Sequence, residues 1–132
     1  ALGYRTSIFK SRKGVITSVK FSLEKGDKTE IKQKMDVFLN RRKEKQPLQY
    51  PSAGSTFKRP QGYFAGALIE KNNLKGFSVG GAMVSEKHAG FVINYNNATS
   101  DDVKTLMAEI QKRVYENDNV KLEPEVIFVG RE

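Results

Sequence analysis

The chain has 132 residues, 38% of them hydrophobic and 29% charged, so it can bury one hydrophobic core but cannot form two large domains. It lacks cysteine and has no apolar run near the roughly 20 residues that span a bilayer, which excludes disulfide bonds, thiolate metal sites and a membrane span. The net charge is +8, and residues 1–60 hold 15 basic against 5 acidic residues, so we expect a soluble cytoplasmic protein with an anionic partner.

The first third of the chain predicts one strand and one helix. Apolar and polar residues alternate over 15–23, as in a strand with one buried face. A helix is predicted over 27–45, because apolar residues recur there at helical spacing: Ile31, Met35, Phe38 and Leu39. We expect this stripe to be buried, together with Phe9 and Phe21. The cations at 41–45 suit the carboxyl end of the helix, and one of them can also contact a phosphate.

The segment Pro51–Pro60 predicts a shaped loop, because prolines at both ends disfavour a helix or a central strand. Gly54 permits backbone geometry that a side chain would block, and Ser55 follows it with a compact hydroxyl. Lys58 and Arg59 can hold an anion nearby, which makes the segment a candidate reaction site. The alternative interpretation is that Ser55 caps the following helix or hydrogen-bonds to its own backbone.

The middle of the chain predicts a short helix and two short strands. Apolar residues over 64–73 indicate the helix, and 77–79 and 82–85 read as strands separated by a bend at Gly80-Gly81. These glycines lack the spacing of a dinucleotide-binding fingerprint. His88 is the only histidine, so no histidine-based metal cluster can form, and we interpret it as structural or ligand-lining.

The last third predicts a strand over 91–95 and an amphipathic helix over 101–116 capped by Thr99 or Ser100. Residues 120–129 return as an extended segment that Pro124 restricts to a sheet edge. These elements predict an α+β fold in which an antiparallel sheet is packed with helices. Because the aromatic residues do not form a stacking platform, we rank a small anionic ligand above a nucleic acid as the partner.

Three sequence marks occur in a fixed order: residues 4–10 (YRTSIFK), the segment Pro51–Pro60, and residues 123–126 (EPEV). Further short matches lie between the last two, at residues 65–70, 74–76, 79–82, 84–89 and 97–99. Together they closely resemble the C-terminal part of the UDP-N-acetylenolpyruvoylglucosamine reductases, flavin enzymes that make UDP-N-acetylmuramate for bacterial peptidoglycan. The resemblance covers essentially the whole chain.

The resemblance implies a catalytic set of Arg5, Ser55 and Glu125. In that chemistry reduced flavin delivers hydride to the enolpyruvyl methylene carbon, and the residues handle the charge and the proton that remain. Arg5 would stabilise the developing negative charge, Ser55 would protonate the neighbouring carbon, and Glu125 would orient or stabilise the enol form.

The same resemblance implies residues for the ligands. Tyr4, Lys43, Lys58 and Arg59 would bind the substrate, UDP-N-acetylglucosamine enolpyruvate, while Gly54 and Ser55 would lie against FAD, with NADPH as the electron donor. No metal, nucleic-acid or membrane partner is implied. Arg59 stands where many members have asparagine. The short spacing from Arg5 to Ser55 suits the branch that lacks a substrate-covering tyrosine, so how the ligand is covered stays open.

The resemblance also predicts how the chain is divided. Residues 1–25 would end the FAD-binding domain, 26–118 would form the substrate-binding domain, and 119–132 would be an extended segment that carries the catalytic glutamate. The glycine-rich flavin-binding stretch is absent from this sequence, so the flavin domain of a longer chain is the expected partner. We expect the isolated chain to be colourless and inactive. Two alternatives are a non-catalytic nucleotide-sugar-binding module and a basic nucleic-acid-binding domain.

Overall fold

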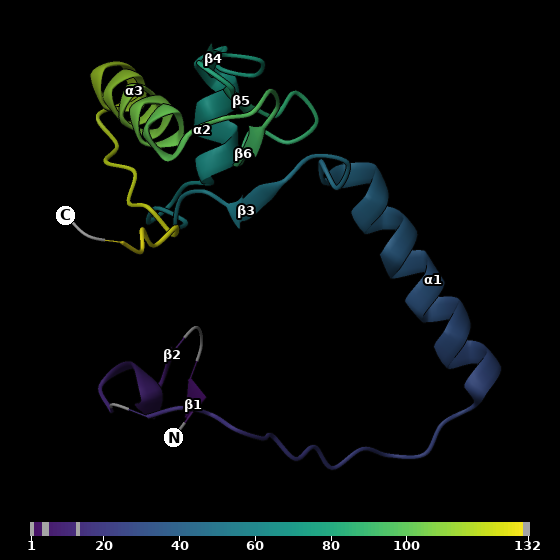
Figure 1. Ribbon diagram of the computed structural model, residues 1–132. Coiled ribbons are helices and arrows are strands. Elements are labelled where there is room, and N and C mark those ends of the chain that lie inside the picture. The colour runs from purple at the N-terminus through teal and green to yellow at the C-terminus, as the bar shows by residue number, and fades with distance from the viewer. Residues whose placement is uncertain (1, 4–5, 13, 131–132) are drawn as a thin grey trace. The chain divides into compact units, whose positions relative to one another are not determined.

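A computed structural model describes residues 2–3, 6–12 and 14–130 (Figure 1). The chain divides into two compact units, Ala1–Gln33 and Lys34–Glu132, which we describe separately. In the first unit β1 (Leu2–Gly3) pairs antiparallel with β2 (Thr6–Ser7), and a short 3-10 helix, η1 (Ile8–Lys10), follows. The hydroxyl of Ser7 accepts a hydrogen bond from the Phe9 amide at the start of η1.

The strand predicted over 15–23 does not form. Residues 14–27 have no regular secondary structure, and the side chains of Val15 and Phe21 are 88% and 76% exposed. A strand is stable only when a neighbour pairs with its backbone, and none of the described strands pairs with this stretch. The expected burial of Phe9 is also wrong, because this side chain is 51% exposed.

The helix predicted over 27–45 is confirmed as α1 (Lys28–Lys45). Asp27 begins it by accepting hydrogen bonds of 2.9 Å from the amides of Thr29 and Glu30, as a capping carboxylate does. The predicted burial of its apolar stripe is wrong, since Met35 and Phe38 are 60% and 66% exposed. Helical spacing fixes which residues share a face, but it does not supply a surface for that face to pack against.

The second unit contains a four-stranded antiparallel sheet (Figure 1). Its spatial order is β3-β6-β5-β4, and the strands are β3 (Ser52–Ser55), β4 (Ser78–Val79), β5 (Ala82–Val84) and β6 (Phe91–Asn94). The predicted loop at 51–60 is therefore partly a strand, although it lies at the sheet edge as the flanking prolines require. The pairing of β3 with β6 shifts register between Ser52 and Ser55, where Gly54 has a φ of 89°.

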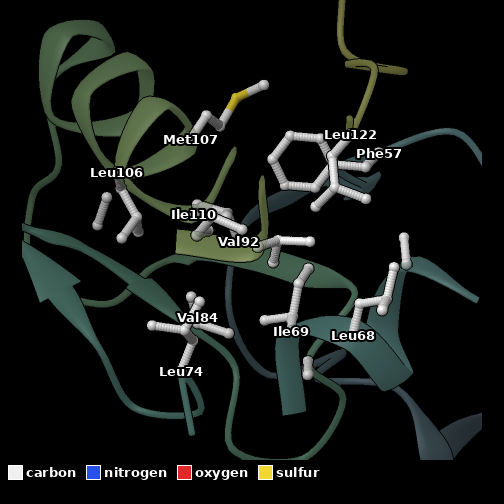
Figure 2. Packing of buried hydrophobic residues seen from close by; sticks show 14 residues of the cluster. Phe57, Leu68, Ile69, Leu74, Val84, Val92, Leu106, Met107, Ile110 and Leu122 are labelled. Atoms are coloured by element: carbon white, nitrogen blue, oxygen red, sulfur yellow. The ribbon is translucent and has the colours of Figure 1, made fainter. Parts of the chain in front are cut away.

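Two helices build the core of this unit: α2 (Ala65–Lys71) and α3 (Ser100–Asp118), which contact each other. Helix α3 also contacts β4 and β5. Figure 2 shows the buried side chains from both helices meeting those of the strands, among them Ile69, Val84, Leu106 and Ile110. The predicted α+β class, with an antiparallel sheet packed with helices, is confirmed.

The start of α3 is fixed by a reciprocal cap. Thr99 accepts from the amide of Asp102, and the Asp102 carboxylate accepts from the Thr99 amide, which confirms Thr99 as the cap. Hydrogen bonds from the backbone amides of Thr99 and Gly81 lower the pKa of Asp102. The bend at Gly80-Gly81 leaves no room for a side chain, because a Cβ on Gly81 would lie 2.1 Å from the carbonyl oxygen of Asn96.

The C-terminal ends of α2 and α3 are joined through Asp118. Its carboxylate accepts from the ammonium of Lys71 and, at 2.6 Å, from the side-chain amide of Asn72. The hydrogen bond from Lys71 and then that from Asn72 lower the pKa of Asp118, while Asp118 raises the pKa of Lys71. The contact therefore links the two helices through charges of opposite sign.

Residues 119–130 leave α3 and run back along the sheet. Leu122 is 1% exposed and belongs to the core, but the predicted strand over 120–129 is confirmed only at one isolated antiparallel bridge, between Phe57 and Pro124. This bridge attaches the end of the chain to the residues that follow β3. It therefore places the two segments that carry the candidate catalytic groups beside each other.

Candidate functional site

Thr56 is the junction between β3, β6 and the C-terminal segment. Its amide donates to the carbonyl of Gly90, its hydroxyl accepts from the amide of Val92, and its carbonyl accepts from the amide of Glu125, each at 2.9 Å. The residue is only 2% exposed. Buried polar groups normally have hydrogen-bond partners, and here these hydrogen bonds join three segments of the chain.

Ser55 stands immediately before this junction and is exposed. Its hydroxyl donates to the carbonyl of Phe57 at 3.4 Å, which is long for an O–H···O hydrogen bond. Helix α2 has Phe64 at its N-cap with no side-chain hydrogen bond, so the interpretation of Ser55 as a helix cap is wrong. The alternative of a local backbone contact is confirmed, and this contact is weak enough for the hydroxyl to turn elsewhere.

Glu125 lies on the neighbouring segment, with its amide bound to Thr56. Glu125 is exposed, as is Ser55. One cavity, of about 370 Å³, is lined by Thr56 and Val126, and another is lined by Lys58 and Glu123. Neither Ser55 nor Glu125 lines these two cavities, although the two residues lie on adjacent segments.

Lys58 and Arg59 are held by contacts on either side. The amide of Lys58 donates to the carbonyl of Glu123 at 2.8 Å, and its ammonium forms a 3.1 Å ion pair with the same residue's carboxylate. The guanidinium carbon of Arg59 lies 4.0 Å from the centre of the Phe64 ring, and its Nε donates to the carbonyl of Tyr63 at 3.3 Å. Stacking of this kind fixes the plane of a guanidinium.

These two cations line a cavity of about 410 Å³, which we call the basic cavity. Its lining residues are Lys58, Arg59, Pro60, Gln61, Tyr63, Asn119, Val120, Lys121 and Glu123. Three of them are cationic and one is acidic, so the lining carries an excess of positive charge. Lys121 is one of these three cations, although the sequence analysis does not single it out.

Lys43 is exposed near the end of α1 and does not line the basic cavity. Its carbonyl accepts a 2.7 Å hydrogen bond from the ammonium of Lys87, which ties the end of α1 to the turn between β5 and β6. Tyr4 and Arg5, the other predicted site residues, lie outside the described residues. The structure therefore brings Ser55, Lys58, Arg59 and Glu125 to one region and leaves Lys43 apart from the basic cavity.

His88 is part of the same hairpin turn and takes a structural position. Its Nδ1 accepts from the amide of Gly90 at 3.1 Å, and its ring lies edge-on to Phe91 at 5.0 Å between ring centres. The described residues contain no group of three or more His, Cys, Asp or Glu side chains able to hold a metal ion. None of the helices in the described part of the chain has the length and apolar character needed to cross a membrane.

The second unit is an α+β domain with a cationic cavity at one edge of an antiparallel sheet. A family model for "UDP-N-acetylenolpyruvoylglucosamine reductase, C-terminal domain" matches residues 46–129. The chain belongs to the family of UDP-N-acetylenolpyruvoylglucosamine reductases, which confirms the resemblance found in the sequence.

Individual relatives agree. The reductase of Clostridium perfringens (strain SM101 / Type A) is 56% identical over 131 residues, covering 99% of this chain and 43% of the relative. That of Caldanaerobacter subterraneus subsp. tengcongensis is 57% identical over 127 residues, covering 96% and 42%. The crystal structure of the reductase from Thermus caldophilus matches with a TM-score of 0.63 and 40% identity, over 80% of this chain and 37% of that one. The chain thus spans less than half the length of these relatives.

Proposed function

We propose that this chain is the substrate-binding part of a reductase that converts UDP-N-acetylglucosamine enolpyruvate to UDP-N-acetylmuramate during cytoplasmic peptidoglycan synthesis. The names of the relatives support the reaction. The observation that carries the proposal is the hydrogen bond from the Glu125 amide to Thr56, because it joins the segment of the proposed carboxylate to the residue next to the proposed proton donor.

The division of labour along the chain is part of the proposal. Residues 1–25 would complete the FAD-binding domain, 26–118 would bind the substrate, and 119–132 would deliver Glu125. The match of a C-terminal domain model to residues 46–129 supports the assignment of the later residues. The remaining length of the relatives supports a flavin-binding partner in the same polypeptide.

The residues around Ser55 fit the approach of a flavin. Gly54 has a positive φ, and nothing lies within 4 Å of where its Cβ would stand, so bare backbone is open next to the hydroxyl. A flat ring can come closer to such a surface than to one with a side chain. When bound, reduced FAD supplies a hydride for the enolpyruvyl methylene carbon, and NADPH supplies the electrons.

The chain's own residues then handle the proton and the charge. Ser55 would give its hydroxyl proton to the neighbouring carbon, which completes the addition of hydride and proton across the double bond, and solvent would reprotonate the serine. Glu125 would orient or stabilise the enol form of the reacting enolpyruvyl group. Arg5 would stabilise the developing negative charge, and losing such a group typically costs about 3 to 4 kcal/mol of transition-state stabilisation. Tyr4, Lys43, Lys58 and Arg59 would hold the substrate.

The test uses the reductase that contains this chain together with its flavin domain. In Ser55→Ala we expect substrate binding to survive while reoxidation of the reduced flavin by substrate slows about 10² to 10⁴-fold, the usual worth of a positioned acid. The matched control is Ser78→Ala, because Ser78 is an exposed serine on β4. Normal turnover by Ser55→Ala would remove the serine from the mechanism and favour a nucleotide-sugar-binding role without catalysis.

A further inference from the structure

The carbonyl of Lys43 lies in the last turn of α1, and its usual helical donor is missing from the sequence. In an α-helix each carbonyl accepts from the amide four residues later, which for Lys43 is residue 47. That residue is Pro47, whose backbone nitrogen carries no hydrogen. The preceding amide, that of Gln46, donates to the carbonyl of Arg42 at 2.9 Å. The Lys43 carbonyl is therefore one of the helix-end groups that take a donor from elsewhere.

Lys87 supplies this donor from the turn between β5 and β6. Its ammonium donates to the Lys43 carbonyl at 2.7 Å, and both residues belong to the second unit. A cation at the carboxyl end of a helix is favourable, because the unpaired carbonyls there carry a partial negative charge. The ammonium thus caps α1 from another element of the fold.

The turn that carries Lys87 is itself fixed from the core. Ser85 is 2% exposed, and its hydroxyl accepts from the amides of Lys87 and His88 at 3.2 and 3.3 Å. The amide of Ser85 donates to the carbonyl of Phe91 at 2.9 Å across the hairpin. A group on a fixed turn loses less freedom when it makes a contact than one on a mobile loop. Lys87 can therefore hold the end of α1 at a set position relative to the sheet.

We propose that Lys87 is a positioning residue for substrate binding, because its ammonium holds the turn of α1 that presents Lys43. The inference rests on the proposed function, in which Lys43 binds the substrate. Lys87 acts through the backbone of residue 43, whereas Lys43 acts through its side chain. The cap matters for binding because a frayed turn has to be ordered again each time the ligand arrives, and this ordering reduces affinity.

A direct contact between Lys87 and the ligand is the competing interpretation. Lys87 also lines a cavity of about 440 Å³, together with Tyr50 and Tyr95, and an ammonium has three hydrogens to donate. The missing amide of Pro47 favours positioning, because it explains why this carbonyl takes a donor from another element. The two interpretations differ in one respect. A positioning residue has no effect on binding once the side chain that it positions is removed.

The experiment uses the reductase that contains this chain together with its flavin domain. Lys87→Met removes the ammonium, Lys87→Arg keeps a cationic donor, and Lys112→Met removes the same charge at an exposed position of α3. We expect Lys87→Met to raise the KM for the enolpyruvyl substrate about three- to tenfold and to leave kcat within about twofold, since positioning affects the ground state and the transition state alike. Lys87→Arg should recover most of the loss, and Lys112→Met should leave KM unchanged.

The same substitution in a Lys43→Met background separates positioning from direct contact. If Lys87 acts only through Lys43, Lys87→Met should raise the KM by less than about twofold in that background. A further rise of about three- to tenfold there would overturn the proposal, because Lys87 would then act on the ligand itself. Equal KM values for Lys87→Met and Lys112→Met in the unchanged background would overturn it as well.

Hydrogen exchange on the same reductase checks the cap independently of catalysis. Peptides that contain the Gln46 amide, which closes the last turn of α1, should exchange at least about threefold faster in Lys87→Met than in Lys112→Met. Equal exchange rates would overturn the capping role even if the KM changed. Failure of the proposed function shows in a different measurement, as normal turnover by Ser55→Ala, on which the exchange rates do not depend.

Discussion

The amide of Glu125 donates a 2.9 Å hydrogen bond to the carbonyl of Thr56. A second backbone hydrogen bond, from Lys58 to the carbonyl of Glu123, lies on the other side of the Phe57–Pro124 bridge. Backbone hydrogen bonds thus hold residues 123–125 against the residues that follow β3, independently of the side chains. Ser55 and Glu125 owe their proximity to this pairing, so the candidate site depends on Thr56 staying in place.

Thr56→Val should destabilise the domain although the two side chains have similar shapes. The substitution removes the hydroxyl that accepts from the Val92 amide and leaves that buried donor without its partner. We expect a loss of about 1–3 kcal/mol in the free energy of unfolding, measured by urea denaturation. Thr105→Val, on the exposed side of α3, is the control and should change little. Equal stability of the two variants would contradict the role of Thr56 as a junction.

Gly81→Ala tests the tight bend between β4 and β5. A Cβ at this position would lie 2.1 Å from the Asn96 carbonyl oxygen and 2.5 Å from the Ala98 amide nitrogen, so the backbone must shift. Overpacking of this kind costs about 1–3 kcal/mol, and thermal unfolding should show a lower Tm. Gly14→Ala serves as the control, since nothing lies within 4 Å of its Cβ position. An unchanged Tm for Gly81→Ala would show that the bend relaxes freely.

Sequence periodicity predicted the helices equally well but did not predict which of them would be buried. Leu106, Ile110 and Val114 of α3 enter the core as expected, whereas Met35 and Phe38 of α1 stay exposed. The spacing of apolar residues determines a face, and burial requires a partner surface that periodicity does not reveal. The strand predicted over 15–23 does not form for a related reason, because a strand needs a hydrogen-bonded neighbour.

The sequence predicts less of the candidate site than of the fold. Residue types alone mark Ser55, Lys58 and Arg59 in one segment, whereas only the family resemblance singles out Glu125. The pairing of residues 56–58 with 123–125 is a long-range contact that no local pattern encodes. The sequence does not distinguish Lys121 from other lysines, which are usually solvated, and only the cavity that it lines does so.

The contact between Asp118 and Lys71 makes stability depend on pH. The pKa of Asp118 is lowered in the folded chain, chiefly by the hydrogen bond from Lys71, so protons bind the unfolded state more readily. Its contribution is therefore complete above the ordinary aspartate pKa of about 4 and is lost as the pH falls through the lower folded value. The pKa of Lys71 is raised, so its contribution holds below about 10.4 and is lost as the pH rises through the higher folded value.

Asp118→Asn should remove the acidic part of this dependence. We expect the variant to be less stable than the unchanged chain at pH 7, and the difference should shrink as the pH is lowered from about 4. Denaturant unfolding at a series of pH values measures it. Glu116→Gln, at an exposed position near the same end of α3, is the matched control. A stability difference between Asp118→Asn and the unchanged chain that stays constant down to acid pH would contradict the assignment to Asp118.

Glu123→Gln separates the two roles of the acidic residue in the basic cavity. The backbone hydrogen bond from Lys58 to the carbonyl of residue 123 is retained, but the 3.1 Å ion pair is lost. Because that pair is exposed, we expect the free energy of unfolding to change by less than about 1 kcal/mol. The freed lysine should bind UDP more tightly, by about two- to fivefold in calorimetry at low salt, since a charge that competes with the phosphate is gone.

The gain should shrink as salt is added, because the groups involved are exposed and salt screens their attraction for the phosphate. Glu70→Gln is the control, since it breaks the 2.6 Å ion pair with Lys75, and neither residue lines the basic cavity. It should leave UDP affinity unchanged. Weaker UDP binding by Glu123→Gln would mean that the carboxylate orders Lys58 for the ligand instead of competing with it.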